Sequence, residues 1–210
     1  IAGYNISNLA GAALAGAALG APLDVLARVL QRFGAKRGDN DGRLMRWRIG
    51  GFSVLLDYAH NPEGLDGLLD IAGHQRGDGR LGLLLGQAGN RGDADVRRLA
   101  STAARHRPER IVLKDIENFL RGRAPGEIPA ILRMQLLSDG LPATALATEL
   151  DEVLAARSLV GWARPGDVVV LPVHARRARE AISSFLNALE SSAWQPPQPL
   201  PALAAAAGPV

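Results

Sequence analysis

The feature that most constrains this chain is a regular alternation of short apolar segments with longer amphipathic ones between residues 44 and 190. Short segments rich in Leu and Val, such as Leu81–Leu85 and Val168–Leu171, are typical of buried β-strands. Between them, apolar residues recur at helical spacing, as over Asp93–Arg107. This alternation predicts an α/β fold: a Rossmann-like, mainly parallel sheet with helices on both faces. Such sheets bind ligands in the crevice beyond the C-terminal ends of their strands.

A β-hairpin is expected at the start of this unit. Two apolar segments, Leu44–Ile49 and Phe52–Leu56, flank Gly50-Gly51, which is a hairpin signal. The second segment is apolar on both faces, as a central strand would be. The same patterns predict further strands at Ile111–Lys114 and Ala143–Ala147, and helices at Gly64–His74, Glu127–Leu137, Glu149–Ala163 and Ala175–Ala188.

The chain divides into four parts. Residues 1–35 predict two helices, separated by Gly20-Ala21-Pro22. Residues 36–43 show no apolar pattern and are interpreted as a linker before the α/β domain of residues 44–190. Residues 191–210, rich in Pro and Ala, are expected to be a disordered tail. Because the chain starts with Ile and lacks a charged leader, we interpret it as a piece of a longer protein.

Composition excludes several classes of protein. The absence of Cys removes disulfides, thiolate zinc sites and cysteine nucleophiles, and it is compatible with a cytoplasmic location. Only Lys36 and Lys114 are lysines, so 22 of the 24 basic residues are arginine. These arginines are spread among 21 acidic residues, a pattern that indicates solvated helix faces rather than a nucleic-acid surface. The apolar stretch Leu9–Leu19 is too short to cross a membrane, which needs about 20 residues.

Polar side chains crowd into the turn after the first buried strand. Asp57, Tyr58, His60 and Asn61 bring a carboxylate, a phenol, an imidazole and an amide together before Pro62 opens the next helix. This edge of the sheet is where a ligand is expected. The alternative is structural, because Asp and Asn at strand ends commonly cap the following helix.

Two further strand-end loops could bind an anion. Gly86–Asp93 is rich in Gly and opens a helix, whose free N–H groups suit negative charge, although the loop lacks the dinucleotide spacing and could be only a turn. Asp115–Arg123 carries Arg121 and Arg123, which could clamp a carboxylate or phosphate or simply be exposed.

Other catalytic motifs are missing from this sequence. A P-loop requires Lys followed by Ser or Thr, but Arg follows Lys36 and Asp follows Lys114. The sequence also lacks a G-x-S-x-G elbow, an H-E-x-x-H pair and an EF-hand loop. We therefore expect this chain to be inactive toward ATP by itself.

The strand-end motifs resemble those of the Mur ligase family. Gly42-Arg43 before the hairpin and the run Asp57–Pro62 are similar to the Gly-Arg hairpin and D-Y-A-H-x-P that open the family's C-terminal domain. Tyr4–Asn8 resembles the H-N-x-x-N segment that ends its central ATPase domain, with Tyr4 in place of His. Gly86–Asp93 is similar to the family's G-x-x-G-x-R loop. Folylpolyglutamate synthases carry a similar D-x-A-H-N-P.

One branch of the family is particularly similar. Leu120–Glu127 reads L-R-G-R-x-x-G-E, which resembles the cyanophycin-synthetase branch. Peptidoglycan ligases have D-N-P-R at this place. The run Arg164–Val169 also resembles this branch. The resemblance implies an enzyme that phosphorylates a carboxylate with ATP and joins the acyl phosphate to an amine, here adding Arg to a poly-Asp backbone.

The resemblance also implies partners and cofactors. It implies ATP and Mg, held mainly by an upstream ATPase domain of the same chain, of which residues 1–35 would be the helical end. It implies an amino acid and a peptide or polymer as substrates. We expect neither nucleic acid nor membrane as a partner, and a homo-oligomer stays possible.

Carried over to this sequence, the resemblance assigns two groups of residues. The nucleotide-facing positions are Asn5, Arg43, Asp57, Tyr58, His60 and Asn61. Candidates for binding the incoming amino acid are Arg91, Asn118, Arg121 and Arg123. Asp115 or Glu117 would suit the guanidinium of an arginine substrate. The sequence indicates no catalytic base and no residue of this chain as a metal ligand.

Two alternatives stay open. The first is a peptidoglycan-precursor or folylpolyglutamate-type ligase with an atypical acceptor loop. The second belongs to another class: a non-catalytic nucleotide-binding or scaffolding module.

Overall fold

A computed structural model describes residues 3–33, 37 and 41–202 of this chain, except for the side chains of residues 3–5. Two N-terminal helices precede a six-stranded sheet whose strands alternate with helices. The elements are α1 (Gly3–Ala18), α2 (Leu23–Arg32), β1 (Met45–Ile49), β2 (Phe52–Asp57), α3 (Pro62–Arg76), β3 (Leu81–Leu85), α4 (Asp93–Arg105), β4 (Arg110–Leu113), α5 (Glu127–Ser138), η2 (Ala143–Ala145), β5 (Leu146–Thr148), α6 (Glu152–Trp162), β6 (Val168–Pro172) and α7 (Arg176–Ser191).

The sheet has the strand order β1-β2-β6-β3-β4-β5. Only β1 is antiparallel to its neighbour, with Met45 opposite Leu56, and the other pairs are parallel. The last strand in sequence, β6, lies between β2 and β3, so that Val170 is the partner of both Leu55 and Leu83. The predicted mainly parallel sheet with an N-terminal hairpin is confirmed.

The hairpin turn depends on its two glycines. Gly50 has φ +52° and Gly51 has φ +83°, and a two-residue turn with positive φ at both central positions matches the twist of the flanking strands. A Cβ on Gly51 would also lie 3.0 Å from Cβ of Pro165. The glycine pair therefore fixes the register of β1 on β2.

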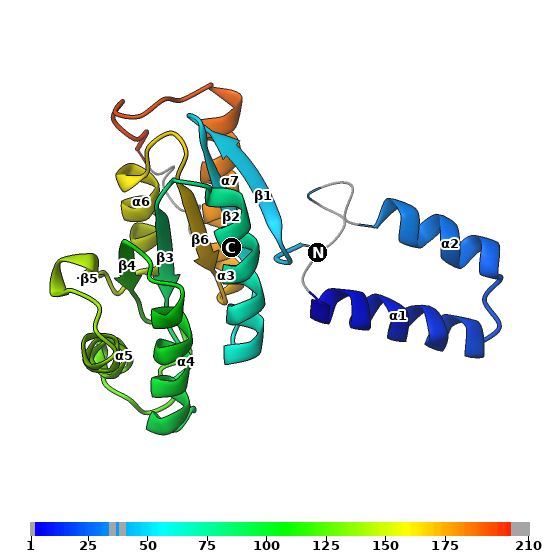
Figure 1. The fold of residues 1–210 in the computed structure, drawn as a ribbon, viewed down its shortest axis with the longest axis horizontal. Coiled ribbons are helices and arrows are strands. Elements are labelled where there is room, and N and C mark those ends of the chain that lie inside the picture. The colour runs from blue at the N-terminus through cyan, green and yellow to red at the C-terminus, as the bar shows by residue number, and fades with distance from the viewer. Residues whose placement is uncertain (1–2, 34–36, 38–40, 203–210) are drawn as a thin grey trace, which may run out of the picture.

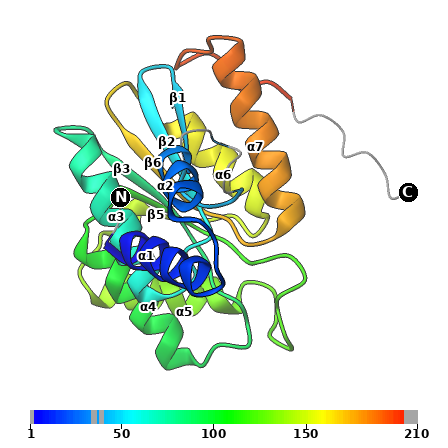
Figure 2. The same cartoon turned by 90° about the vertical axis from the view of Figure 1, so that its right-hand side faces the viewer.

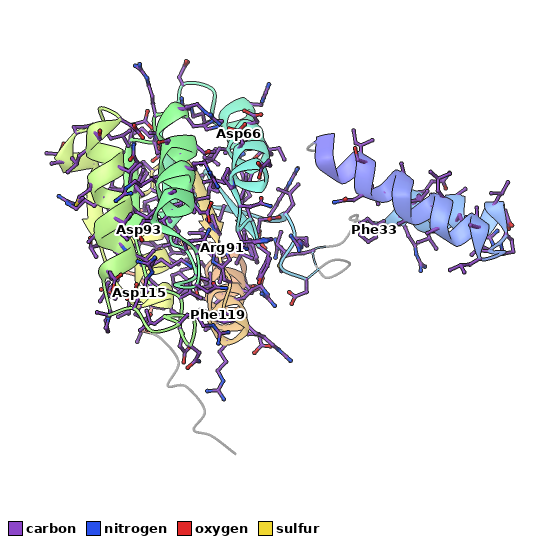
Figure 3. All side chains as sticks on the ribbon, turned by 90° about the horizontal axis from the view of Figure 1, so that it is seen from below. Phe33, Asp66, Arg91, Asp93, Asp115 and Phe119 are labelled. Atoms are coloured by element: carbon purple, nitrogen blue, oxygen red, sulfur yellow. The ribbon has the colours of Figure 1, made fainter. Side chains whose placement is uncertain are left out.

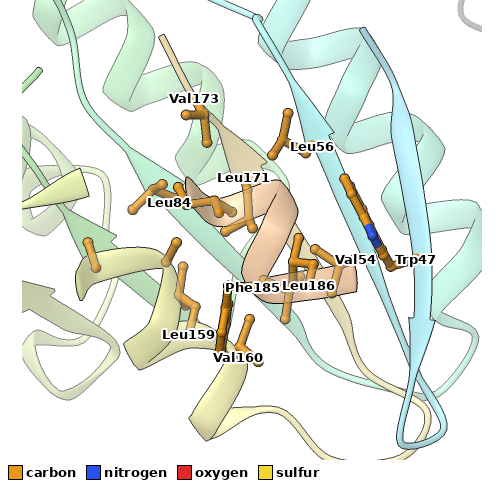
Figure 4. Packing of buried hydrophobic residues seen from close by; sticks show 14 of the residues in the cluster. Trp47, Val54, Leu56, Leu84, Leu159, Val160, Leu171, Val173, Phe185 and Leu186 are labelled. Carbon is orange, nitrogen blue, oxygen red and sulfur yellow. The ribbon is translucent and has the colours of Figure 1, made fainter. Parts of the chain in front are cut away.

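Helices cover both faces of the sheet (Figures 1 and 2). Buried residues of α3, α4 and α5 share one core cluster with one face, and those of α6 and α7 share another cluster with the opposite face and β1. In the second cluster, Phe185 and Leu186 of α7 pack near Val54 and Leu171 of the sheet (Figure 4). The expectation of helices on both faces is confirmed.

The strand expected at Ala143–Ala147 is wrong in its first half. Residues Ala143–Ala145 form a 3₁₀ turn, in which the N–H of Ala145 donates to the carbonyl of Pro142, and only Leu146–Thr148 pair with β4. The helix expected from Glu149 begins at Glu152 instead. The reason is a cap, because Asp151 Oδ1 accepts from the N–H groups of Val153 and Leu154 at 2.8 Å.

The expectation of a disordered tail from residue 191 is wrong for residues 191–202. Trp194 is only 6% exposed and lies edge-to-face with Phe52, with 6.4 Å between ring centroids. Its indole N–H donates to Pro199, and Arg157 donates to the carbonyl of Pro201. Burial of one large aromatic ring outweighs the local bias toward disorder. Residues 203–210 lie outside the described part of the chain.

The helices α1 and α2 project from the α/β unit (Figure 1). They pack closely on each other, because a Cβ on Gly16 would lie 2.9 Å from Cδ2 of Leu26. Their apolar side chains are nevertheless exposed: Leu14 by 72%, Leu19 by 89% and Leu23 by 74%. Among the residues that the structure describes, no helix is both long and apolar enough to span a membrane.

Candidate functional site

The C-terminal ends of four parallel strands meet at one edge of the sheet. These strands are β2, β6, β3 and β4, in that order. Figure 3 shows Arg91, Asp93, Asp115 and Phe119, from the loops after β3 and β4, in one region of the molecule, whereas Phe33 lies on the helical pair. The predicted strand-end residues therefore lie at one edge of the sheet.

Asp57, at the end of β2, ties the strand-end turn to the hairpin. Its Oδ2 accepts from the N–H of Leu44 at 2.7 Å, and its Oδ1 accepts from the N–H of Ala59 at 2.8 Å. Burial raises the pKa of this carboxyl, against the lowering effect of these hydrogen bonds and of Arg43. The carboxylate thus holds the residue that follows Arg43 and the residue that follows Tyr58.

Three of the predicted nucleotide-facing residues form one surface. The guanidinium carbon of Arg43 lies 5.1 Å from the ring centroid of Tyr58, and the rings of Tyr58 and His60 are 5.3 Å apart. Asn61 has a different role. Its Oδ1 accepts from the N–H of Gly64 at 2.8 Å, so its side chain caps α3. Asn5 belongs to α1, and its side chain lies outside the described residues.

The loop after β3 packs directly against the loop after β4. The N–H of Gly89 donates to the carbonyl of Phe119 at 2.8 Å, and a Cβ on Gly89 would lie 1.9 Å from the carbonyl oxygen of Leu120. Only glycine allows this approach. The Gly-rich loop therefore uses this glycine for packing between loops.

Arg123 strengthens the same junction. Its Nε donates to the carbonyl of Gly89, its Nη2 donates to the carbonyl of Arg91 and to Asp93, and its Nη1 donates to Glu127, over distances of 2.6–2.9 Å. Hydrogen bonds to Asp93 and then Glu127 raise the pKa of Arg123. Every nitrogen of this guanidinium already has a protein partner.

The other predicted amino-acid ligands are exposed in the loops after β3 and β4. Arg91, Asn118 and Arg121 are all exposed, and the guanidinium carbon of Arg121 lies 5.0 Å from the ring centroid of Phe119. Asn118 has φ +63° and Arg121 has φ +51°, so the segment from Asn118 to Arg121 begins and ends with a residue in the left-handed conformation.

Asp115 is a buried carboxylate beside this segment. Its Oδ2 accepts from the N–H of Gly126 at 2.8 Å. Its Oδ1 is buried and has no hydrogen-bond partner within the described part of the chain. Glu117, the other acidic candidate, is exposed.

Four polar residues near the strand ends were not predicted from the sequence. Lys114, Glu152 and His174 form a buried polar cluster behind Tyr58, and Gln87 donates to the carbonyl of His60 at 3.0 Å. A signal was present, since Lys114, Gln87 and His174 each follow a strand by one or two residues. The sequence could not indicate that Glu152, in α6, reaches the same point.

The described residues contain no group of three His, Asp or Glu placed to hold a metal ion. A shallow hollow of 440 Å³ lies between α3, α4 and α5, lined by residues such as Asp66, Arg97 and Arg105. Its lining includes none of Arg43, Tyr58 and His60, so we do not place the site there. The exposed guanidinium of Arg43 beside the rings of Tyr58 and His60 suits an anion and a flat ring, and it offers no set of metal ligands.

Comparison with known proteins identifies the family. Residues 42–172 match the family described as "Mur ligase, glutamate ligase domain". The chain is 30% identical over 185 residues to cyanophycin synthetase from Synechocystis sp., covering 88% of this chain and 21% of that protein. It is 32% identical over 184 residues to cyanophycin synthetase from Crocosphaera subtropica, covering 87% and 20%.

A third relative comes from another branch. UDP-N-acetylmuramoyl-L-alanyl-D-glutamate–2,6-diaminopimelate ligase from Corynebacterium glutamicum is 28% identical over 176 residues, which cover 80% of this chain and 32% of that protein. The chain thus spans about a fifth of the cyanophycin synthetases and a third of this ligase.

Solved structures show the same fold. UDP-N-acetylmuramate-alanine ligase from Thermotoga maritima matches with a TM-score of 0.61 at 13% identity, over 90% of this chain and 39% of that one. A murein peptide ligase from Psychrobacter arcticus matches with a TM-score of 0.59 at 18% identity, over 87% and 36%. On the family match and the sheet described above, this chain belongs to the Mur ligase family of ATP-dependent ligases and contains its C-terminal domain.

Proposed function

We propose that this chain is the C-terminal part of an ATP-dependent amide ligase of the cyanophycin-synthetase type, which adds arginine to an aspartate polymer. The observation that carries the proposal is that the C-terminal edge of the sheet bears two different surfaces. One combines Arg43 with Tyr58 and His60, and the other, in the loop after β4, carries Arg121 and the acidic residues Asp115 and Glu117. The similarity to two cyanophycin synthetases across most of the chain supports this branch.

The first surface would face the nucleotide. Arg43 is exposed and can offer a two-pronged contact to phosphate oxygens, while the rings of Tyr58 and His60 can lie against the base. Asp57, whose carboxylate is held by two backbone N–H groups, would act by fixing this surface. Asn61 would act in the same way through its cap on α3.

The second surface would bind the incoming amino acid. An α-carboxylate needs a guanidinium with free donors, which Arg121 has and Arg123 does not, because Arg123 is held by Gly89, Arg91, Asp93 and Glu127. We therefore assign the carboxylate to Arg121, with Arg91 and Asn118 beside it.

The side chain of the amino acid would meet an acidic partner. Glu117, exposed in this segment, is the acidic group that an incoming guanidinium can reach directly. The Oδ1 of Asp115 has no partner but is buried, so it would pair with the substrate only if the loop opens. This pair favours arginine over an amino acid with a neutral or acidic side chain.

The upstream part of the enzyme would supply the remaining chemistry. We assign residues 1–35 to the end of the central ATPase domain and residues 36–43 to the linker. The exposed Leu14 of α1, Leu19 of the turn after it and Leu23 of α2 support this assignment, because apolar side chains exposed together indicate a missing protein neighbour. ATP and Mg would be held mainly by that domain, with Arg43 and Tyr58 closing over the nucleotide.

The test is a kinetic comparison in the full-length enzyme with arginine and an aspartate polymer as substrates. Arg43→Ala should raise the KM for ATP about ten- to a hundredfold, the effect of losing one charge-assisted contact, and leave the KM for arginine unchanged. Arg98→Ala is the matched control, because Arg98 is an exposed arginine of α4 paired with Asp95.

Two results would change the assignment. Turnover with diaminopimelate or glutamate in place of arginine would favour a peptidoglycan-precursor or polyglutamate ligase. Nucleotide binding without any amide formation in the full-length protein would favour a non-catalytic module.

A further inference from the structure

A fully buried cluster of charged and polar side chains lies behind the proposed nucleotide surface. Lys114, just beyond β4, is 0% exposed; Glu152, the first residue of α6, and His174, between β6 and α7, have side chains exposed by 2% and 6%. Lys114 Nζ is paired with Glu152 Oε1 and lies 3.2 Å from His174 Nδ1. The cluster thus joins three segments that are distant in sequence.

Such a cluster is costly to bury, so its geometry calls for an explanation. Removing a carboxylate and an ammonium from water is repaid only when both are paired and hydrogen-bonded. Glu152 meets this requirement, because it accepts from Lys114 and, through Oε1 at 3.0 Å, from the N–H of His174. In proteins, apolar side chains in place of a buried ion pair often leave the fold as stable or make it more stable. Stability alone therefore does not account for this cluster, which also contacts the strand-end turn.

The hydrogen-bond chemistry fixes the state of His174. A lysine ammonium has donors only, so His174 Nδ1 must accept from Lys114. The ring proton then resides on Nε2, which lies 3.0 Å from the carbonyl oxygen of Ala59 and donates to it. Burial, and next the Lys114 ammonium, hold the pKa of His174 well below its ordinary value, so the ring is neutral near pH 7.

His174 reaches the strand-end turn at its centre. Ala59 separates Tyr58 from His60, and its carbonyl is the acceptor for His174. The His174 ring also lies edge-on to the ring of Tyr58, with 5.4 Å between centroids. The next carbonyl, that of His60, accepts from Gln87. One ring therefore sets both the peptide orientation and the position of the Tyr58 ring.

We propose that Lys114, Glu152 and His174 are positioning residues that hold Tyr58 and His60 in the orientation that contacts the nucleotide. Lys114 selects the Nε2–H form of His174, Glu152 holds both partners, and His174 fixes the turn. The role of this network toward ATP rests on the function proposed above, whereas the state of the His174 ring does not.

The first experiment tests the network itself. In the 210-residue chain labelled with ¹⁵N-histidine, the ring nitrogens of His174 should show a neutral imidazole with its proton on Nε2 at pH 7. In Lys114→Met combined with Glu152→Gln, which removes both charges together, this preference should weaken, because only the carbonyl of Ala59 then selects the proton on Nε2. A cationic ring, or a proton on Nδ1 in the unaltered chain, would overturn the proposal whatever the function of the site.

The second experiment tests the consequence in the full-length enzyme. His174→Phe should raise the KM for ATP about tenfold, with kcat and the KM for the amino acid within about twofold, since a supporting residue typically costs ten- to a hundredfold. His174→Gln should raise the KM for ATP less than His174→Phe does, because its amide N–H can donate to the carbonyl of Ala59. Thr102→Val, which removes a buried hydroxyl in α4, is the control.

The outcomes separate the two proposals. If Arg43→Ala raises the KM for ATP and His174→Phe does not, the positioning role is overturned. If neither variant changes the KM for ATP, the nucleotide surface itself is overturned. If His174→Phe and His174→Gln raise the KM for ATP equally and lower the melting temperature equally, the network only stabilises the fold and the positioning role is overturned.

Discussion

Arg123 Nη2 donates to Asp93 Oδ1 at 2.7 Å, and this bond joins the loop after β4 to the first residue of α4. Arg121 lies two residues away, yet it is exposed and its guanidinium lies over Phe119. Two arginines of one short motif thus have different surroundings. One holds the loops together, and the other is free to meet a ligand.

The first prediction is that substitution by lysine separates these two arginines. Arg121→Lys in the full-length enzyme should raise the KM for the amino acid about tenfold, because lysine cannot reproduce the two-pronged contact with a carboxylate, and should leave the melting temperature unchanged. Arg123→Lys should lower the melting temperature by roughly 3 °C, the shift expected for about 1 kcal/mol in a chain of this size. An Arg123→Lys variant of unchanged stability with a raised KM would reverse the two roles.

The second prediction concerns the C-terminal segment. Trp194→Ala should destabilise the chain by about 3–5 kcal/mol, the usual cost of removing a large buried aromatic ring. The reason is that Trp194 is 6% exposed and contacts Phe52, which is itself fully buried in the sheet. Denaturant unfolding measures the change, with Gln195→Ala, at an exposed neighbouring position, as control. A loss below about 1 kcal/mol would mean that the segment contributes little to the fold.

The third prediction is a dependence of stability on pH at Asp167. Burial favours the neutral carboxyl, but the hydrogen bonds from Arg80 and from the N–H of Arg164 outweigh it and lower the pKa below the usual 3.8. The unfolded state therefore binds the proton more readily. The stabilisation is present above the unfolded pKa and is lost as the pH falls through the folded one.

The measurement is the free energy of unfolding against pH for the unaltered chain and Asp167→Asn. The difference between them should be constant from neutral pH down to about pH 5 and should then shrink as the pH falls further. Asp78→Asn, in an exposed turn near Arg80, controls for the loss of one negative charge. A difference that stays constant down to pH 2 would contradict the role of Asp167.

The strands and helices of the α/β unit could be predicted from the sequence because their signals are local. Leu81–Leu85 is apolar at successive positions, and Gly50-Gly51 can adopt the φ values of a tight turn. The fold of residues 191–202 could not be predicted in this way, because Trp194 is stabilised by Phe52, a residue far away in sequence.

The candidate site could likewise be predicted only in part. The strand-end rule places Asp57, Tyr58 and His60 at the C-terminal edge of the sheet. Local sequence cannot show that Arg123 has four protein partners whereas Arg121 is exposed. Lys114 and His174 follow strands and so carry the same strand-end signal, but the sequence cannot indicate that Glu152 of α6 meets them in the folded sheet.

The last prediction concerns Gly89, where the two loops of the amino-acid surface touch. A Cβ at this position would lie 1.9 Å from the carbonyl oxygen and 2.6 Å from the carbonyl carbon of Leu120, and both are backbone atoms that cannot rotate away. Gly89→Ala must therefore push the loop after β4 outward and move Arg121 with it. In the full-length enzyme the KM for the amino acid should rise at least tenfold, while the KM for ATP should change little because Tyr58 belongs to another loop. Gly92→Ala is the matched control, since a Cβ there would have only Asp95 Oδ2 nearby, at 3.8 Å. Equal kinetics for the two alanine variants would show that the contact between the loops does not set the acceptor site.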